Sequence, residues 1–241
     1  MPRFTRGETT IYYEESGSGF PLLVIAPGAM NSAIELWSSA TINPLDAYRD
    51  DFRLIAMDQR NAGESSGPLE VGDPWGAYAR DQLGLLDHLG AQDFHVMGAC
   101  IGCSFALKLI ELAPRRVLAA VLEQPVGVTR DNEPLYEALW RGWGDQLLRR
   151  RADVDASQIE DLRTRMLAGD FVLSVSREFV GHCSTPLLVL PGVDRYHPTE
   201  TGREIAALAP HADLVEPWKD PDHVGPATEA VREFLDAHTP A

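Results

Sequence analysis

The motif Gly-Ala-Cys-Ile-Gly at residues 98–102 constrains the fold more than any other segment of this chain. A short apolar run precedes it at residues 94–97, and a helix is expected from residue 103 to about residue 112. A glycine two residues to either side of the cysteine relieves crowding where a strand turns sharply into a helix. The motif therefore predicts a strand–turn–helix unit that displays the Cys100 side chain above a sheet.

Strand-like and helix-like segments alternate along most of the sequence. Strands are expected at residues 10–15, 22–26, 52–57, 94–97, 117–122, 186–190 and 212–216. Helices are expected at residues 77–89, 103–112 and 228–237. This alternation predicts an α/β fold in which helices cover both faces of a mostly parallel sheet.

One long segment, residues 126–183, shows no strand pattern. Helices are expected within it at residues 135–150, 157–167 and 172–180. We therefore expect a single domain, residues 1–241, in which residues 126–183 are inserted between two strands as a small helical cap. A longer crossover connection is the alternative.

Composition and charge limit the partners of the chain. Lys and Arg number 21 against 36 Asp and Glu, which gives a net charge of −15. This acidity argues against nucleic acid and anionic membranes as main partners. The first residues lack the apolar region of a secretion signal, and no apolar run approaches the roughly 20 residues that span a bilayer. Three cysteines suit a reducing compartment. We expect a soluble cytoplasmic protein, and the sequence leaves its oligomeric state open.

Cys100 is the candidate nucleophile. A helix start supplies free N–H groups and the positive end of the helix dipole, and both favour a thiolate over a thiol. A buried structural cysteine is the alternative. A nucleophile of this kind needs a base that an acid holds in place. Asp194 follows the expected strand at residues 186–190, and His223 lies between the last strand and the last helix. Glu123 competes with Asp194 as the acid.

These segments together resemble the α/β-hydrolase superfamily over nearly the whole chain. Pro27-Gly28-Ala29 resembles the His-Gly-X loop after the third strand, and residues 58–65 resemble the D-x-R-G-x-G-x-S turn. The order Cys100, Asp194, His223 is the family's order of nucleophile, acid and base. The resemblance implies an α/β-hydrolase fold with a Cys-His-Asp triad.

Three residues depart from the usual family pattern. Cysteine replaces serine at residue 100, as in dienelactone hydrolases and polyhydroxyalkanoate synthases. Pro27 replaces the common histidine, so the oxyanion loop can be set differently. Asn61 replaces a glycine, and asparagine tolerates the left-handed conformation better than most residues.

The resemblance also implies an oxyanion hole formed by the backbone N–H groups of Ala29 and Ile101. Candidate pocket residues are apolar or aromatic and lie near the oxyanion loop or in the expected cap: Met30, Trp37, Tyr136, Trp140 and Trp143. Cys103 is expected to serve helix packing, with a resolving thiol as the alternative. Cys183 beside His182 is a poor ligand set, so we expect no metal and no cofactor.

The expected activity is hydrolysis of an ester, thioester or lactone carbonyl of a small acyl substrate through an acyl-thioester intermediate. Two alternatives remain. The same triad could transfer the acyl group to an alcohol, amine or thiol, because thioesters react well with such acceptors. The chain could also be a binding or regulatory module that kept the fold and lost the chemistry.

Overall fold

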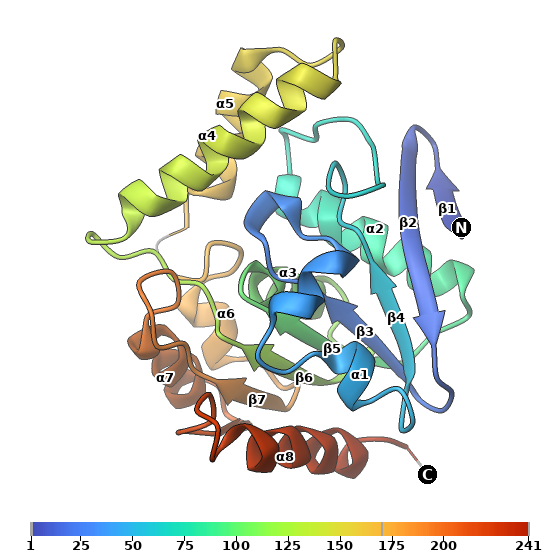
Figure 1. Cartoon of the computed structure of the whole chain (residues 1–241), viewed down its shortest axis with the longest axis vertical. Coiled ribbons are helices and arrows are strands. Elements are labelled where there is room, and N and C mark those ends of the chain that lie inside the picture. Colours follow the sequence, from blue (N-terminus) through green and yellow to red (C-terminus); the bar gives the residue numbers. More distant parts are fainter. Residues whose placement is uncertain (1, 170, 241) are drawn as a thin grey trace.

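The computed structural model describes residues 2–169 and 171–240, which form an eight-stranded sheet in the order β1-β2-β4-β3-β5-β6-β7-β8 (Figure 1). The strands are β1 (Arg3–Arg6), β2 (Thr9–Ser16), β3 (Pro21–Ile25), β4 (Arg53–Met57), β5 (Phe94–Ala99), β6 (Val117–Glu123), β7 (Leu187–Leu190) and β8 (Ala212–Leu214). The β1–β2 and β2–β4 pairs are antiparallel, and every other neighbouring pair is parallel. The α/β-hydrolase fold and the mostly parallel sheet predicted from the sequence are confirmed.

Helices connect these strands and cover the sheet. They are η1 (Ala29–Asn31) and η2 (Ile34–Ser39), both 3-10 helices, and α1 (Pro44–Ala47), α2 (Pro74–His88), α3 (Ile101–Leu112), α4 (Glu133–Arg150), α5 (Ala156–Met166), α6 (Arg177–Gly181), α7 (Thr199–Leu208) and α8 (Val224–Ala237). Within the described residues, no helix is both long and apolar enough to cross a membrane.

The core has two parts, one on each face of the sheet. Along β3, Leu23 and Ile25 belong to the cluster that includes α2, α3 and α7, whereas Leu22 and Val24 belong to the cluster that includes α8. Successive strand residues point to opposite faces, so both faces of β3 are buried. This explains why its sequence is a continuous apolar run.

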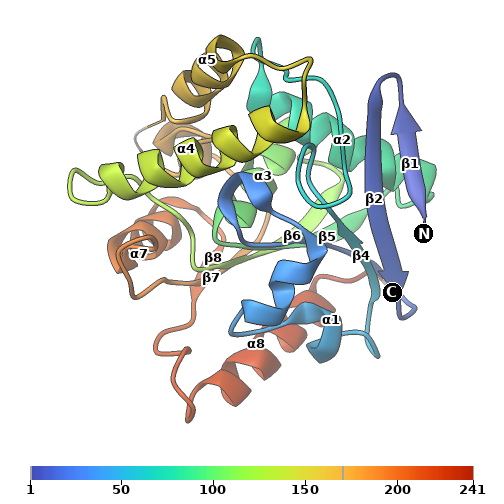
Figure 2. The ribbon, with the colours of Figure 1, turned by 45° about the horizontal axis from the view of Figure 1, so that its top comes forward.

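Three helices, α4, α5 and α6, lie between β6 and β7 in the sequence. Figures 1 and 2 show α4 and α5 side by side at the opposite end of the molecule from α8, and α4 also contacts η1. The helix expected at residues 172–180 is wrong in its first half, because helix α6 begins only at Arg177. Ser176 caps α6 by accepting a bond from the Phe179 N–H, and Leu173 has a positive φ of 70° that interrupts a helix.

Two glycines fix the turn between β5 and α3. A Cβ atom added at Gly98 would lie 2.3 Å from the Gly102 carbonyl oxygen, and one at Gly102 would lie 2.2 Å from the Ile25 carbonyl oxygen. Both distances are far inside van der Waals contact, so no larger residue fits without a backbone shift. The start of α3 therefore packs directly against β5 and β3, which sets the position of Cys100.

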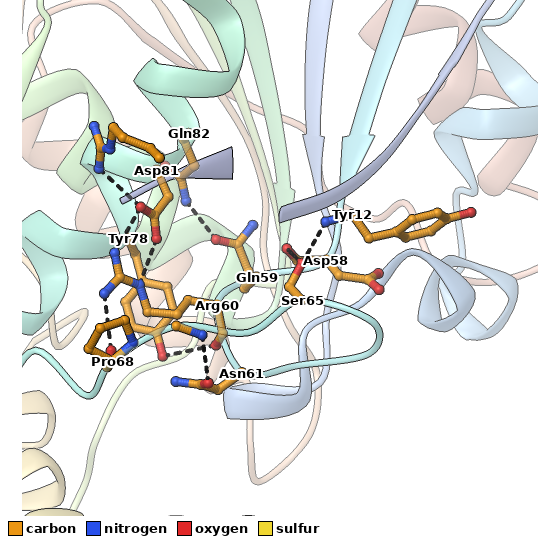
Figure 3. A network of polar contacts seen from close by, with 12 residues as sticks. Tyr12, Asp58, Gln59, Arg60, Asn61, Ser65, Pro68, Tyr78, Asp81 and Gln82 are labelled. Atoms are coloured by element: carbon orange, nitrogen blue, oxygen red, sulfur yellow. Dashed lines mark hydrogen bonds and ion pairs between the residues drawn. The ribbon is translucent and has the colours of Figure 1, made fainter. Parts of the chain in front are cut away.

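A buried polar network joins the loop after β4 to its neighbours (Figure 3). The Asp58 carboxylate accepts bonds of 2.8 Å from the N–H groups of Ile34 and Glu64, and thereby ties this loop to the segment after η1. Arg60 forms a two-point ion pair with Asp81 of α2, at 2.7 and 2.8 Å. Asn61 has a φ of 63°, so the left-handed conformation expected for it is present.

Candidate active site

Cys100 forms the turn itself, with φ 57° and ψ −120°. This strained conformation points its side chain away from both β5 and α3. The sulfur lies in the wall of a cavity of about 360 Å³. The cavity is lined by residues of the oxyanion loop, the nucleophile turn, α4 and the loop after β7: Gly28, Ala29, Met30, Cys100, Ile101, Val126, Tyr136, Leu139, Trp140, Leu173, Tyr196 and His197.

The histidine beside Cys100 is His197. Its Nδ1 atom lies 2.8 Å from Asp194 Oδ1 and 3.0 Å from Asp194 Oδ2. Its Nε2 atom is buried and has no hydrogen-bond partner among the described residues, although the ring is close enough to Cys100 to affect the pKa of its thiol. The arrangement is a chain of carboxylate, imidazole and thiol that ends in the cavity.

A tight turn after β7 brings His197 and Asp194 together. The Asp194 carbonyl accepts the His197 N–H at 3.1 Å, and Asp194 Oδ1 accepts the N–H groups of Tyr196 at 2.9 Å and His197 at 3.1 Å. A Cβ atom at Gly192 would lie 2.1 Å from the His197 Cβ, so His197 folds back over the glycine. The acid and the neighbouring base thus come from one loop.

The pKa values of this group shift in opposite directions. Burial raises the pKa of the Cys100 thiol, but the interaction with the neighbouring His197 ring, with the backbone groups of Gly28 and Ile101, outweighs burial and lowers it. Burial lowers the pKa of His197, but the sulfur of Cys100 and the Asp194 carboxylate outweigh burial and raise it to about 9. Both shifts favour a thiolate–imidazolium pair.

His223, the base expected from the sequence, lies elsewhere. It precedes α8, its Nδ1 atom pairs with Asp220 Oδ1 at 2.7 Å, and it does not line the cavity. Its side chain is about half exposed, at 46%. Asp194 therefore orients His197 instead of His223, and His197 replaces His223 as the candidate base. The spacing Asp-x-x-His after Gly192 was the sequence signal that could have identified it.

Glu123, the competing acid, is buried at the end of β6 without a histidine partner among the described residues. One carboxyl oxygen accepts the Ile42 N–H at 3.3 Å, and the other has no partner in the described part of the chain. Burial raises its pKa to about 8. The acid that bonds a histidine beside Cys100 is therefore Asp194.

Cys103 is fully buried, and its thiol donates to the carbonyl oxygens of Gly98 at 3.1 Å and Glu123 at 3.3 Å. The Cys100 N–H donates to the same Glu123 carbonyl at 2.9 Å. Burial raises the pKa of Cys103 well above its ordinary value. These contacts fit the packing role expected for Cys103 better than that of a resolving thiol.

The loop after β3 faces the nucleophile turn. Gly28 and Ala29 have positive φ values of 116° and 52°, and both line the cavity with Ile101. Backbone groups of Gly28 and Ile101 reach the Cys100 sulfur. The two backbone segments predicted to form the oxyanion hole thus lie on either side of the candidate nucleophile.

The five residues expected to line the pocket divide into two groups. Met30, Tyr136 and Trp140 line the cavity. Trp37 belongs to the core on the α8 side of the sheet, and Trp143 is buried behind Trp140, with their rings at 5.4 Å and 81°. The pocket roles expected for Trp37 and Trp143 are therefore wrong.

The start of α4 holds the loop that carries Asp194 and His197. Asn132 is buried, and its Nδ2 group donates to the carbonyls of Gly127 at 2.8 Å and Arg195 at 3.0 Å. The Tyr136 hydroxyl donates to the carbonyl of Tyr196. Sequence reasoning missed Asn132, because no local pattern connects it with a loop more than sixty residues away.

In the described residues, no group of three or more His, Cys, Asp or Glu side chains is arranged to hold a metal ion. Cys183 is buried, and its thiol donates weakly to the Thr185 carbonyl, whereas His182 Nδ1 lies 2.8 Å from the Glu178 carbonyl oxygen. The polar side chains that line the cavity are Cys100, His197, Tyr136, Trp140 and Tyr196.

Known proteins resemble this chain in sequence. The family described as alpha/beta hydrolase fold matches residues 21–183. A 2-hydroxy-6-oxononadienedioate/2-hydroxy-6-oxononatrienedioate hydrolase of Burkholderia vietnamiensis is 27% identical over 95% of this chain and 91% of its own length. RutD of Azorhizobium caulinodans is 31% identical, but the match spans 48% of this chain and only 42% of that protein.

Solved structures resemble the chain along nearly its whole length. The meta-cleavage product hydrolase CumD of Pseudomonas fluorescens IP01 has a TM-score of 0.70 at 20% identity and covers 95% of each chain. Est816, described as an N-acyl homoserine lactone degrading enzyme, has a TM-score of 0.71 at 19% identity over 97% of this chain and all of its own. At such identities the likeness establishes the fold. Together with the family match, it shows that the chain belongs to the alpha/beta hydrolase fold family and is a hydrolase of that family.

Proposed function

We propose that this hydrolase cleaves an ester, thioester or lactone through a triad of Cys100, His197 and Asp194. The observation that supports the proposal most directly is that His197, which Asp194 holds by a hydrogen bond of 2.8 Å, lines the same cavity as Cys100 and lowers the pKa of its thiol. The opposite pKa shifts of Cys100 and His197 prepare a nucleophilic thiolate and a protonated base.

The reaction follows from this arrangement. The Cys100 thiolate attacks the substrate carbonyl carbon, and the carbonyl π electrons move onto oxygen. The tetrahedral intermediate collapses, the His197 ring gives its proton to the leaving alcohol or thiol, and an acyl-thioester forms. Neutral His197 then takes a proton from water, which attacks the thioester carbonyl. Collapse releases the carboxylic acid and restores the thiolate–imidazolium pair.

The developing oxyanion needs hydrogen-bond donors. We assign this role to the N–H groups of Ala29 and Ile101, because the two backbone segments flank Cys100 and the start of α3 leaves its first N–H groups free. Asp194 keeps the His197 ring in one orientation and stabilises its positive charge.

Mass spectrometry of the trapped enzyme tests the proposal. Wild type is mixed with a panel of 4-nitrophenyl esters and acyl thioesters, quenched, and peptide-mapped. We expect the acyl mass on the peptide that contains Cys100, no turnover by Cys100→Ala, and at least a hundredfold lower turnover by Cys100→Ser, because a hydroxyl is poorly placed where a larger ionised sulfur fits. Full turnover by Cys100→Ala would refute the proposal.

The full-length relative supports a second candidate, hydrolysis of a meta-cleavage product such as a 2-hydroxy-6-oxononadienedioate. Apart from His197, which the reaction uses, the cavity offers no cationic side chain to the two carboxylates that this name denotes, so we rank this activity below acyl hydrolysis. Acyl transfer is distinguished by adding an alcohol, amine or thiol acceptor to the same assay. An increase of acylated acceptor at the expense of free acid would favour a transferase.

A further inference from the structure

The cavity around Cys100 is apolar apart from the reacting groups. None of the side chains that line it belongs to Lys, Arg, Asp or Glu. Its walls come from Met30 of η1, Ile101 of α3, Leu173 of the loop before α6, and Leu139 with Trp140 of α4. The Tyr136 hydroxyl is already used by the Tyr196 carbonyl. A ligand in this space meets hydrocarbon and aromatic surface.

The charged group nearest the reacting histidine is an anion. The Asp194 carboxylate lies 2.8 Å from His197 Nδ1, whereas burial raises the pKa of Glu123 to about 8 and so leaves it largely uncharged at neutral pH. Lys219, in the segment between β8 and α8, donates to Gln124 and lies 3.8 Å from Asp194 Oδ2. Arg195 instead donates to the Asp131 carbonyl and lines a separate, exposed hollow. Apart from the His197 ring and the backbone N–H groups that the reaction uses, the cavity therefore gives a carboxylate no charged partner.

The rim of the cavity is also apolar. Leu139 and Tyr196 line it and are 41% and 39% exposed, and both are among the few exposed large hydrophobic side chains of the described residues. Exposed apolar surface that continues into a cavity marks a binding site more often than chance exposure does. The volume of about 360 Å³ is at the small end of the range for ligand sites, about 300–1,000 Å³.

We propose that the acyl group of the substrate is small, uncharged and apolar, that it occupies the cavity beneath α4, and that the enzyme selects against acyl groups that end in a carboxylate. The proposal rests on the acyl hydrolysis proposed above. The reason is desolvation, because a buried carboxylate without a hydrogen-bonding or cationic partner is strongly unfavourable.

Matched esters test the selection. The acyl groups of 4-nitrophenyl hexanoate and mono-4-nitrophenyl adipate have equal carbon counts but differ in a terminal carboxylate. The methyl ester of the second compound restores neutrality and controls for bulk and polarity. We expect kcat/KM for the carboxylated ester to be at least about a hundredfold below that for the hexanoate, and the methyl ester to recover most of the loss. Equal rates for hexanoate and adipate would overturn the inference.

A charge placed at the rim sharpens the test. Leu139→Lys adds an ammonium at the cavity mouth, and Leu139→Gln is the matched neutral change. We expect Leu139→Lys to reduce the preference for the neutral ester by about tenfold, since a close opposite charge compensates the carboxylate, whereas Leu139→Gln leaves the preference unchanged. An equal change in both variants would show that shape, not charge, sets the selection.

A binding measurement separates the inference from the activity. Calorimetry with Cys100→Ala measures the affinity for hexanamide and for adipamate, its carboxylated counterpart. Binding of either amide is measured without any reaction. If hexanamide binds more tightly than adipamate but wild type cleaves no ester, the inference about the apolar site is supported and the proposed reaction is refuted. If wild type cleaves the esters but both amides bind equally well, the proposed reaction is supported and the inference about the apolar site is overturned.

Discussion

Asn132 is predicted to control the activity without touching the substrate. It is 2% exposed and does not line the cavity. Its side chain makes three hydrogen bonds: from the Thr129 N–H at 2.7 Å, and to the carbonyls of Gly127 at 2.8 Å and Arg195 at 3.0 Å. The last bond helps to hold the loop that carries Asp194 and His197, so Asn132→Ala removes one of the bonds that attach this loop to the start of α4.

The size of the effect follows from these three bonds. A protein hydrogen bond contributes about 1 kcal/mol net, so deleting three costs about 3 kcal/mol. Because Arg195 is exposed, its carbonyl can bond water, and we expect a loss of about 2 kcal/mol in unfolding free energy. The loop keeps the Tyr136–Tyr196 bond, so we expect kcat to fall between about tenfold and a hundredfold, with KM changed less than about twofold.

Three measurements check this prediction: urea unfolding, steady-state kinetics on the best ester, and the pH dependence of Cys100 alkylation by iodoacetamide. A less well-held His197 should raise the alkylation midpoint toward that of an ordinary thiol. Asn43→Ala is the matched control, because Asn43 accepts the Leu45 N–H at the start of α1; it should lose about 1 kcal/mol of stability and keep kcat. An Asn132→Ala enzyme that loses stability but keeps both kcat and the alkylation midpoint would refute the positioning role.

Three further outcomes are expected. His197→Gln should lower kcat by at least about a thousandfold, whereas His223→Gln should keep it within about twofold; the reverse result in ester kinetics would restore His223 as the base. The pKa of His197 is raised to about 9, so protonated His197 stabilises the folded state fully below about pH 6.5, and this stabilisation is lost as the pH rises through 9. Cys100→Ala should lower the pKa of His197 in an NMR titration, and an unchanged pKa would contradict the coupling between the two residues. Gly98→Ala should lower the free energy of unfolding by more than about 3 kcal/mol, because its Cβ would lie 2.3 Å from a carbonyl oxygen. Gly142→Ala in α4, where no atom lies within 4 Å, should raise the free energy of unfolding by as much as about 1 kcal/mol. Similar urea midpoints for the two variants would contradict the packing argument.

The sequence predicted the strands that are buried on both faces. Residues 22–26 and 117–122 are apolar because helices cover each side of the sheet there, and such runs are visible without any long-range information. β1 (Arg3–Arg6) was missed because this edge strand is mostly exposed and carries two arginines. The end of the long insertion was misread as helical because the apolar side chains of residues 171–175 are buried without forming a helix.

The candidate nucleophile was predictable for a local reason, and the base was not. The close backbone contacts of the turn require glycine at residues 98 and 102, so the local sequence alone indicates the turn that positions Cys100. The choice between His197 and His223 depends on where a loop folds in space. Chain order favoured His223, but the hydrogen bonds of Asp194 to the backbone of Tyr196 and His197 close a turn that brings His197 to the cavity.

Placing acid and base on one loop links the chemistry to the helices above the cavity. Asp194 and His197 cannot move independently, because side-chain and backbone hydrogen bonds between them close the same turn. The loop is held in turn by Asn132 and Tyr136 at the start of α4, and Tyr136 also forms part of the cavity wall. A displacement of α4 that enlarged the acyl cavity would therefore shift the base relative to Cys100. Acyl-chain length and kcat should consequently change together in variants of α4, instead of separating into independent effects on binding and reaction.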